Sequence, residues 1–176
     1  VNYLTSLKSD LLKDQVDMEK VLDSSAVISN DILEAFGLIF SGKGSEEFRR
    51  RHVTSSYTAP YFYPNNSTYI SLVNSGTLNV IKDFDLKTQL AELYNVKYKE
   101  LERVDSFIKN LVDDLIYPYM LKNIQFLTTN GIESAKPLKN NEVSNMLGSY
   151  LNFLIARKEA YSEIKNDFDT IIKEEQ

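Results

Sequence analysis

Apolar residues recur every seven positions from Leu4 to Ile39, which is the period of a helix packed in a bundle. The residues at the two heptad positions are Leu4, Leu11, Met18, Ile32 and Ile39, and Leu7, Val21, Ile28 and Ala35. The pattern is interrupted only by Asp14 and Ser25. The residues that widen the apolar face are Leu12, Leu22, Leu33 and Phe36. We expect one long helix over about residues 2–40.

Two later stretches have the same helical period and predict helices over about residues 84–129 and 141–174. The first should begin at Asp83 or Asp85 and be kinked or broken near Tyr117, because Pro118 has no backbone N–H. Its apolar residues are Leu86, Leu90, Leu93, Tyr94, Tyr98, Leu101, Val104, Phe107, Ile108, Leu111, Leu115, Met120, Leu121, Ile124 and Leu127. Those of the last helix are Val143, Leu147, Tyr150, Leu154, Tyr161, Ile164, Phe168 and Ile171. We expect residues 132–138 to form a loop.

Residues 41–82 read as an insert of short helices and irregular chain. Ser45 is a suitable N-cap for a short helix through about Val53. The cap of a second short helix is expected at Asn65–Ser67 or Thr68, and Gly76 should end it. The chain has only six Gly and four Pro, which favours long elements with few corners. We therefore predict an all-α fold: one domain over 1–176, an elongated up-down bundle of three long helices with the insert as a fourth layer.

Charge and composition narrow the classes of partner. The net charge of −5 disfavours nucleic-acid binding, which needs a basic face. The absence of cysteine excludes disulfides and thiolate metal sites but leaves the compartment open. The longest uncharged apolar run, Ala35–Phe40, is much shorter than the ~20 residues of a transmembrane helix. The pattern does not distinguish a neighbouring helix of the same chain from a second copy, so the oligomeric state stays open.

No set of residues forms a catalytic, metal or cofactor signature. His52 is the only histidine, and Glu-x-x-His pairs and a Gly-rich phosphate loop are both missing. The paired acids Asp83/Asp85 and Asp167/Asp169 read as a helix start and a solvated helix face. We therefore expect a protein that is not an enzyme, with no catalytic, cofactor-binding or metal-binding residues and no cofactor.

One group of residues is the best candidate for contacts with a ligand or partner. It joins arginine donors to aromatic rings: Arg49, Arg50, Arg51, Tyr57, Tyr61, Tyr63 and Tyr69. Such a combination could hold a small anion or carboxylate. The alternative is that the rings close the end of the bundle and that the arginines form a solvated cluster with Glu46 and Glu47.

A motif in the insert resembles a family of uncharacterised bacterial proteins, a domain of unknown function found mostly in the Bacteroidetes group. The matching stretch runs from Tyr63 through Ile81, with its characteristic residues at Ser67, Thr68, Tyr69, Leu72, Ser75, Gly76, Leu78 and Ile81. The pattern continues at Leu86, Leu90 and Tyr94, and the opening from Tyr3 to Leu11 is also similar to the family. The motif also has a purely structural explanation, as a helix cap, a helix stop and three apolar anchors.

The resemblance implies single-pass membrane-anchored proteins with a helical extracytoplasmic domain, and it implies no activity. The resemblance implies a transmembrane segment upstream of Val1, which itself opens directly into a helical pattern. The expected location is the periplasmic side of a bacterial inner membrane, with the cytoplasm as the alternative. The expected function is protein interaction or envelope sensing, with an unidentified protein partner. The alternative is a small-molecule sensor domain resembling bundle-type chemoreceptor ligand domains.

Overall fold

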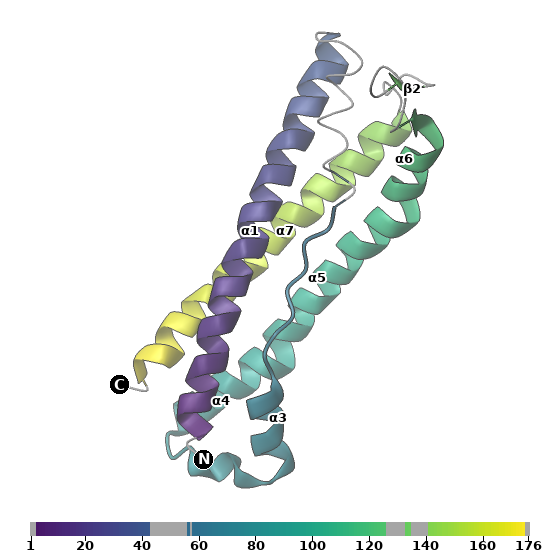
Figure 1. The fold of residues 1–176 in the computed structure, drawn as a ribbon. Coiled ribbons are helices and arrows are strands. Elements are labelled where there is room, and N and C mark those ends of the chain that lie inside the picture. The colour runs from purple at the N-terminus through teal and green to yellow at the C-terminus, as the bar shows by residue number, and fades with distance from the viewer. Residues whose placement is uncertain (1–2, 43–55, 57, 126–132, 135–140, 175–176) are drawn as a thin grey trace. The chain divides into compact units, whose positions relative to one another are not determined.

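The computed structural model describes residues 3–42, 56, 58–125, 133–134 and 141–174. Most of these residues are helical, which confirms the all-α class (Figure 1). In chain order the elements are α1 (Tyr3–Ser41), α3 (Ser67–Asn74), the 3-10 turn η2 (Thr77–Val80), α4 (Phe84–Glu92), the π-helical turn η3 (Leu93–Lys97), α5 (Tyr98–Leu111), the π-helical turn η4 (Val112–Ile116), α6 (Tyr117–Asn123), the short strands β1 (Ile124–Gln125) and β2 (Glu133–Ser134), and α7 (Asn141–Glu174).

The chain packs as two compact units, and α1, α5 and α7 contribute residues to both. The first unit comprises Val1–Leu22, Tyr61–Asp105 and Arg157–Gln176, and the second comprises Asp23–Pro60 and Ser106–Ala156. The side chains considered below as a candidate site all belong to the first unit. No helix in the described part of the chain combines the length and the apolar character that a membrane crossing requires.

The heptad pattern of α1 correctly identifies its buried face. Every heptad residue from Leu7 to Ile39 is buried, and this includes the two polar interruptions, Asp14 and Ser25. The expected widening of the face is wrong at Leu12 and Leu33, which are 45% and 54% exposed. Each of them directly follows a residue of the first heptad set, Leu11 or Ile32, and so points about 100° further away from the second set. These two leucines therefore face solvent. Leu22 and Phe36 follow residues of the second set instead and are half-buried.

The second helical stretch begins as predicted, with the Asp83 side chain accepting a hydrogen bond from the Leu86 N–H (3.0 Å). We expected a kink or a break near Pro118; the chain stays helical there, so the break is wrong and the kink stays a prediction. The irregularity is instead the π-helical turn η4, where the Tyr117 N–H bonds to the Val112 carbonyl five residues back. A π turn shifts the hydrogen-bond register by one residue, and so accommodates a proline that has no N–H to donate.

This stretch ends earlier than the expected residue 129. The helix stops at Asn123, whose side-chain amide donates to the Tyr119 carbonyl (2.8 Å) and occupies an acceptor at the helix end. Strands β1 and β2 then pair antiparallel, which corrects the prediction of a loop at residues 133–134. Three residues assigned to the apolar face of this stretch are also exposed: Phe107, Leu115 and Leu121.

The last helix, α7, has the bounds that its periodicity predicts, and all eight of its apolar positions are buried. In the motif of residues 63–81, Leu72 and Ile81 are buried and Leu78 packs against the core. Gly76 follows α3 with a left-handed φ of 67°. The N-cap is Asn66, within the expected Asn65–Ser67, although its side chain makes no capping hydrogen bond; the narrower assignment of the cap to Ser67 or Thr68 is wrong.

Candidate functional site

The polar interruption of the α1 heptad, Asp14, is a fully buried carboxylate with three hydrogen bonds. Its Oδ1 accepts from the backbone N–H of Asn65 (2.8 Å) and from the Asn65 side-chain amide (2.6 Å). Its Oδ2 accepts from the Tyr98 hydroxyl (2.6 Å). Burial raises the pKa of Asp14, and these hydrogen bonds offset part of that rise because they stabilise the charged form.

A second carboxylate lies one helical turn before Asp14. Asp10 is 9% exposed, and its Oδ2 accepts a hydrogen bond from the Thr68 hydroxyl (2.6 Å). This bond explains why Thr68 does not cap α3, since its hydroxyl is directed to α1. The negative charge of Asp10 also contributes to the raised pKa of Asp14.

A buried ion pair connects α5 to α7. The Nε and Nη2 atoms of Arg157 lie 2.8 and 2.7 Å from Oδ1 of Asp105, and the arginine side chain is fully buried. The other carboxylate oxygen of Asp105 accepts from the backbone N–H of Phe62 (3.3 Å). Burial raises the pKa of Asp105, while the positive charge of Arg157 lowers it.

Together, Asp14 and Asp105 hold the extended segment 61–66, which has no regular structure of its own. Each carboxylate accepts one backbone N–H of this segment, from Asn65 and Phe62 respectively. The segment runs beside α1 and α5 (Figure 1). Backbone donors removed from water need such acceptors, so the two acids have a structural role.

Aromatic rings surround these acids in edge-to-face and stacked contacts. The Tyr69 and Tyr94 rings stack with centroids 4.3 Å apart, and Tyr94 meets Tyr98 edge-on at 5.2 Å. Phe62 lies edge-on to both Tyr98 (5.7 Å) and Tyr161 (6.0 Å). Such geometries add stability beyond the area that the rings bury.

The two neighbouring tyrosines Tyr94 and Tyr98 differ in their hydroxyl groups. Tyr98 donates to Asp14, whereas the Tyr94 hydroxyl is buried and has no hydrogen-bond partner among the described residues. Burial is the main cause that raises the pKa of both phenols, and the Asp14 charge adds to it. Both tyrosines therefore remain protonated over the physiological range.

Of the residues predicted to contact a ligand, the three that the structure describes, Tyr61, Tyr63 and Tyr69, do not form one group. Arg49, Arg50, Arg51 and Tyr57 lie outside the described residues. Tyr61 and Tyr63 have ring centroids 6.3 Å apart, and Tyr63 is 79% exposed. Tyr69 is instead buried, and its hydroxyl accepts from the Asn95 side-chain amide (2.9 Å). Among the described aromatics of segment 61–63, Phe62 is the one that closes the core.

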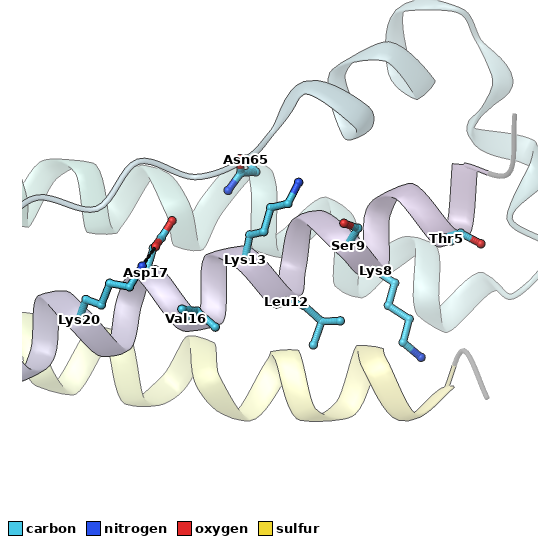
Figure 2. Close-up of a pocket in the computed structure, with 9 residues that line it drawn as sticks. All are labelled: Thr5, Lys8, Ser9, Leu12, Lys13, Val16, Asp17, Lys20 and Asn65. Atoms are coloured by element: carbon cyan, nitrogen blue, oxygen red, sulfur yellow. Dashed lines mark hydrogen bonds and ion pairs between the residues drawn. The ribbon is translucent and has the colours of Figure 1, made fainter.

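An open groove lies on the solvent side of α1, opposite the buried acids. Its volume is about 590 Å³, and it is lined by Thr5, Lys8, Ser9, Leu12, Lys13, Val16, Asp17, Lys20 and Asn65. Figure 2 shows Leu12 and Val16 along α1 with lysines on either side of them. Lys20 forms an ion pair with Asp17 (2.8 Å). We call this surface the α1 groove; it combines exposed apolar side chains with a cationic rim.

Neither the buried cluster nor the α1 groove contains a recognisable reactive set. Within the described residues, no group of three or more histidine, cysteine, aspartate or glutamate side chains could hold a metal ion. Comparisons with known protein families, with curated proteins and with solved structures found no significant similarity to this chain.

The sequence interpretation did not identify Asp105, Arg157 or the role of Asp14. A signal was present, because each of these residues occupies a core position of an apolar pattern. Asp14 lies at a heptad position, Asp105 lies between Leu101 and Ile108, and Arg157 lies between Leu154 and Tyr161. Charged residues at such positions are buried in pairs or networks, so the pattern identifies them but not their partners.

Proposed function

We propose that this chain is a non-enzymatic helical domain that binds another protein through the α1 groove. The observation that carries the proposal is the exposure of Leu12 (45%) and Val16 (51%) side by side in a groove lined by lysines. Exposed apolar side chains with a polar rim are characteristic of interaction surfaces.

The buried polar groups support a structural role for the core beneath this groove. Asp10, Asp14 and Asp105 all accept hydrogen bonds from the protein's own residues. A catalytic carboxylate must instead be able to reach a substrate. The buried acids therefore hold α1 and the segment 61–66 in place, and a partner would contact the exposed residues of the α1 groove.

The resemblance of residues 63–81 supports placing the domain in a membrane-anchored protein, on the periplasmic side of a bacterial inner membrane. In this proposal a segment outside the chain crosses the membrane. The domain would be a bundle of three long helices with residues 41–82 as a fourth layer, and it would bind its partner without nucleic acid or a cofactor.

Residues 1–176 contain no cysteine, which allows a direct test of location. Lys99 is exposed on α5, so Lys99→Cys gives this domain one reactive thiol, and any cysteine outside residues 1–176 of the full-length protein is replaced by serine. A membrane-impermeant maleimide should label this thiol in spheroplasts as completely as in lysed cells. Labelling only after lysis would place the domain in the cytoplasm.

The binding proposal is tested by site-specific photo-crosslinking in living cells. A photoreactive amino acid at position 16 should form a discrete protein adduct, and the same group at position 99 should not. Equal adducts at both positions, or none at position 16, would contradict the proposed function. A ligand-dependent thermal shift together with no adduct would instead favour the small-molecule sensor.

A further inference from the structure

We infer that the α1 groove binds an acidic amphipathic helix of a partner protein. This inference rests on the proposed function and adds the chemistry of the partner. It is drawn from three properties of the groove: its charge, its length and the size of its lining side chains.

The charge of the groove is opposite to that of the whole chain. Lys8, Lys13 and Lys20 line it with Asp17 as its only acid, while the protein carries a net charge of −5. Asp17 is already paired with Lys20, and no described residue forms an ion pair with Lys8 or Lys13. Glutamate or aspartate side chains of a partner would supply the missing counter-charges, which favours an acidic ligand.

The length of the groove and the sizes of its side chains suit a helix of the partner. From Thr5 to Lys20 the groove follows α1 for 16 positions, about 24 Å at a rise of ~1.5 Å per residue. This length matches roughly four turns of a partner helix. The small side chains of Ser9 and Thr5 lie about one and two turns before Leu12, and Val16 lies about one turn after it. Together these four side chains form a row along which a second helix can pack.

A membrane surface fits these features less well. The groove offers only two large apolar side chains, Leu12 and Val16, whereas a helix that lies in a bilayer presents a broad apolar face. The carboxylate of Asp17, one turn before Lys20, would also repel an anionic lipid surface. A helix can place its own charges to either side of Asp17, which a lipid surface cannot do.

The test uses designed helical peptides and the purified full-length protein. One peptide carries a leucine stripe flanked by glutamates, a second has lysines in place of the glutamates, and a third has glutamines. Fluorescence anisotropy should show the acidic peptide binding most tightly, with an affinity that falls as salt is added. Equal binding of the basic or the neutral peptide would overturn the inference.

Charge reversal in the protein gives the matched control. Lys8→Glu with Lys13→Glu should weaken binding of the acidic peptide by about tenfold or more. Lys99→Glu with Lys158→Glu changes the net charge equally on exposed positions away from the groove and should have little effect. Circular dichroism establishes that all variants are folded. Equal weakening by both double variants would mean that net charge alone drives binding, and would overturn the inference.

Two further measurements distinguish other occupants. Sedimentation velocity tests for a second copy, and flotation with phosphatidylglycerol vesicles tests for a lipid surface. Self-association or vesicle binding that depends on Lys8 and Lys13, without binding of the acidic peptide, would overturn the inference. If position 16 forms a protein adduct in cells but the acidic peptide does not bind, the inference fails and the proposed function stands.

Discussion

The Asp14 carboxylate binds both the backbone N–H and the side-chain amide of Asn65, 51 residues later in the chain. Asn65 also lines the α1 groove, so one residue connects the buried acid to the proposed binding surface. The polar residue that interrupts the α1 heptad thus positions an irregular segment against α1. Because the contact lies entirely within the first unit, it can be tested by substitutions in that unit.

Asp14→Asn should change how stability depends on pH. The raised pKa of Asp14 means that its favourable contribution is complete below the unfolded pKa of about 3.8 and is lost as the pH rises through the folded pKa. Asparagine can keep all three hydrogen bonds without carrying a charge. Relative to the wild type, the variant should therefore gain stability as the pH rises.

The measurement is urea unfolding of both proteins from pH 4 to pH 8. At each pH the free energy of unfolding of the wild type is subtracted from that of the variant. This difference cancels the contributions that both proteins share, including that of Asp105. Asp23→Asn, at an exposed position of α1, is the control and should show no such trend. A wild type that becomes more stable than the variant with rising pH would contradict the account.

The neighbouring tyrosines provide a matched pair of substitutions. Tyr98→Phe removes a donor to a buried carboxylate and should lower the free energy of unfolding by about 1.5–3 kcal/mol. Tyr94→Phe removes a buried hydroxyl with no described partner and should be neutral or stabilising. Chemical denaturation of the two variants measures the difference, and an equal loss in both would show that the Asp14 bond is unimportant.

The buried ion pair should show strong coupling between α5 and α7. Arg157→Met leaves Asp105 as an unpaired buried charge and should cost about 3–5 kcal/mol. Adding Asp105→Asn removes that charge and retains an acceptor for the Phe62 N–H, so the double variant should be more stable than Arg157→Met alone.

Equilibrium unfolding of the two single variants and the double variant measures this rescue. The exposed pair between Lys165 and Glu19 (2.9 Å) is the control, and Lys165→Met should produce no measurable change. If the double variant loses the sum of the single losses, Asp105 and Arg157 do not act as a pair.

Two glycines should respond to alanine with opposite signs. At Gly76 the φ of 67° is left-handed, so Gly76→Ala should destabilise by about 1 kcal/mol or more. Gly148 lies inside α7, where an added methyl group meets no atom within 4 Å, so Gly148→Ala should stabilise by about 0.5–1 kcal/mol. Thermal and urea unfolding would reveal the signs, and stabilisation by Gly76→Ala would contradict the assigned role in ending α3.

The spacing of apolar residues predicted the helices well, because burial of one face of each helix determines that spacing. The eight apolar positions of α7 and the heptad of α1 are examples. The spacing did not locate the helix end at Asn123, where the side-chain amide bonds to the Tyr119 carbonyl, or the π turn that precedes Pro118 in place of a break. Local bonds of this kind leave no periodic signal.

The hydrogen-bond partners within the buried polar cluster could not be predicted from the sequence, for another reason. The positions of Asp14, Asp105 and Arg157 in apolar patterns indicate that they are buried. Their partners lie 51, 43 and 52 residues away in the chain, at Asn65, Phe62 and Asp105. Only the packing of the helices brings such residues together. The α1 groove was missed because Leu12 was assigned to the core face.

Single-cysteine protection shows whether a partner protein covers the α1 groove in the cell. In the full-length protein with Val16→Cys, the rate of maleimide labelling in intact cells is divided by the rate for Lys99→Cys, and the same ratio is measured on purified protein. We expect the ratio in cells to be lower than in the purified protein by about fivefold or more, and to be restored when Lys8→Glu and Lys13→Glu are added. Equal ratios in cells and in the purified protein would show an open groove and contradict the proposed function.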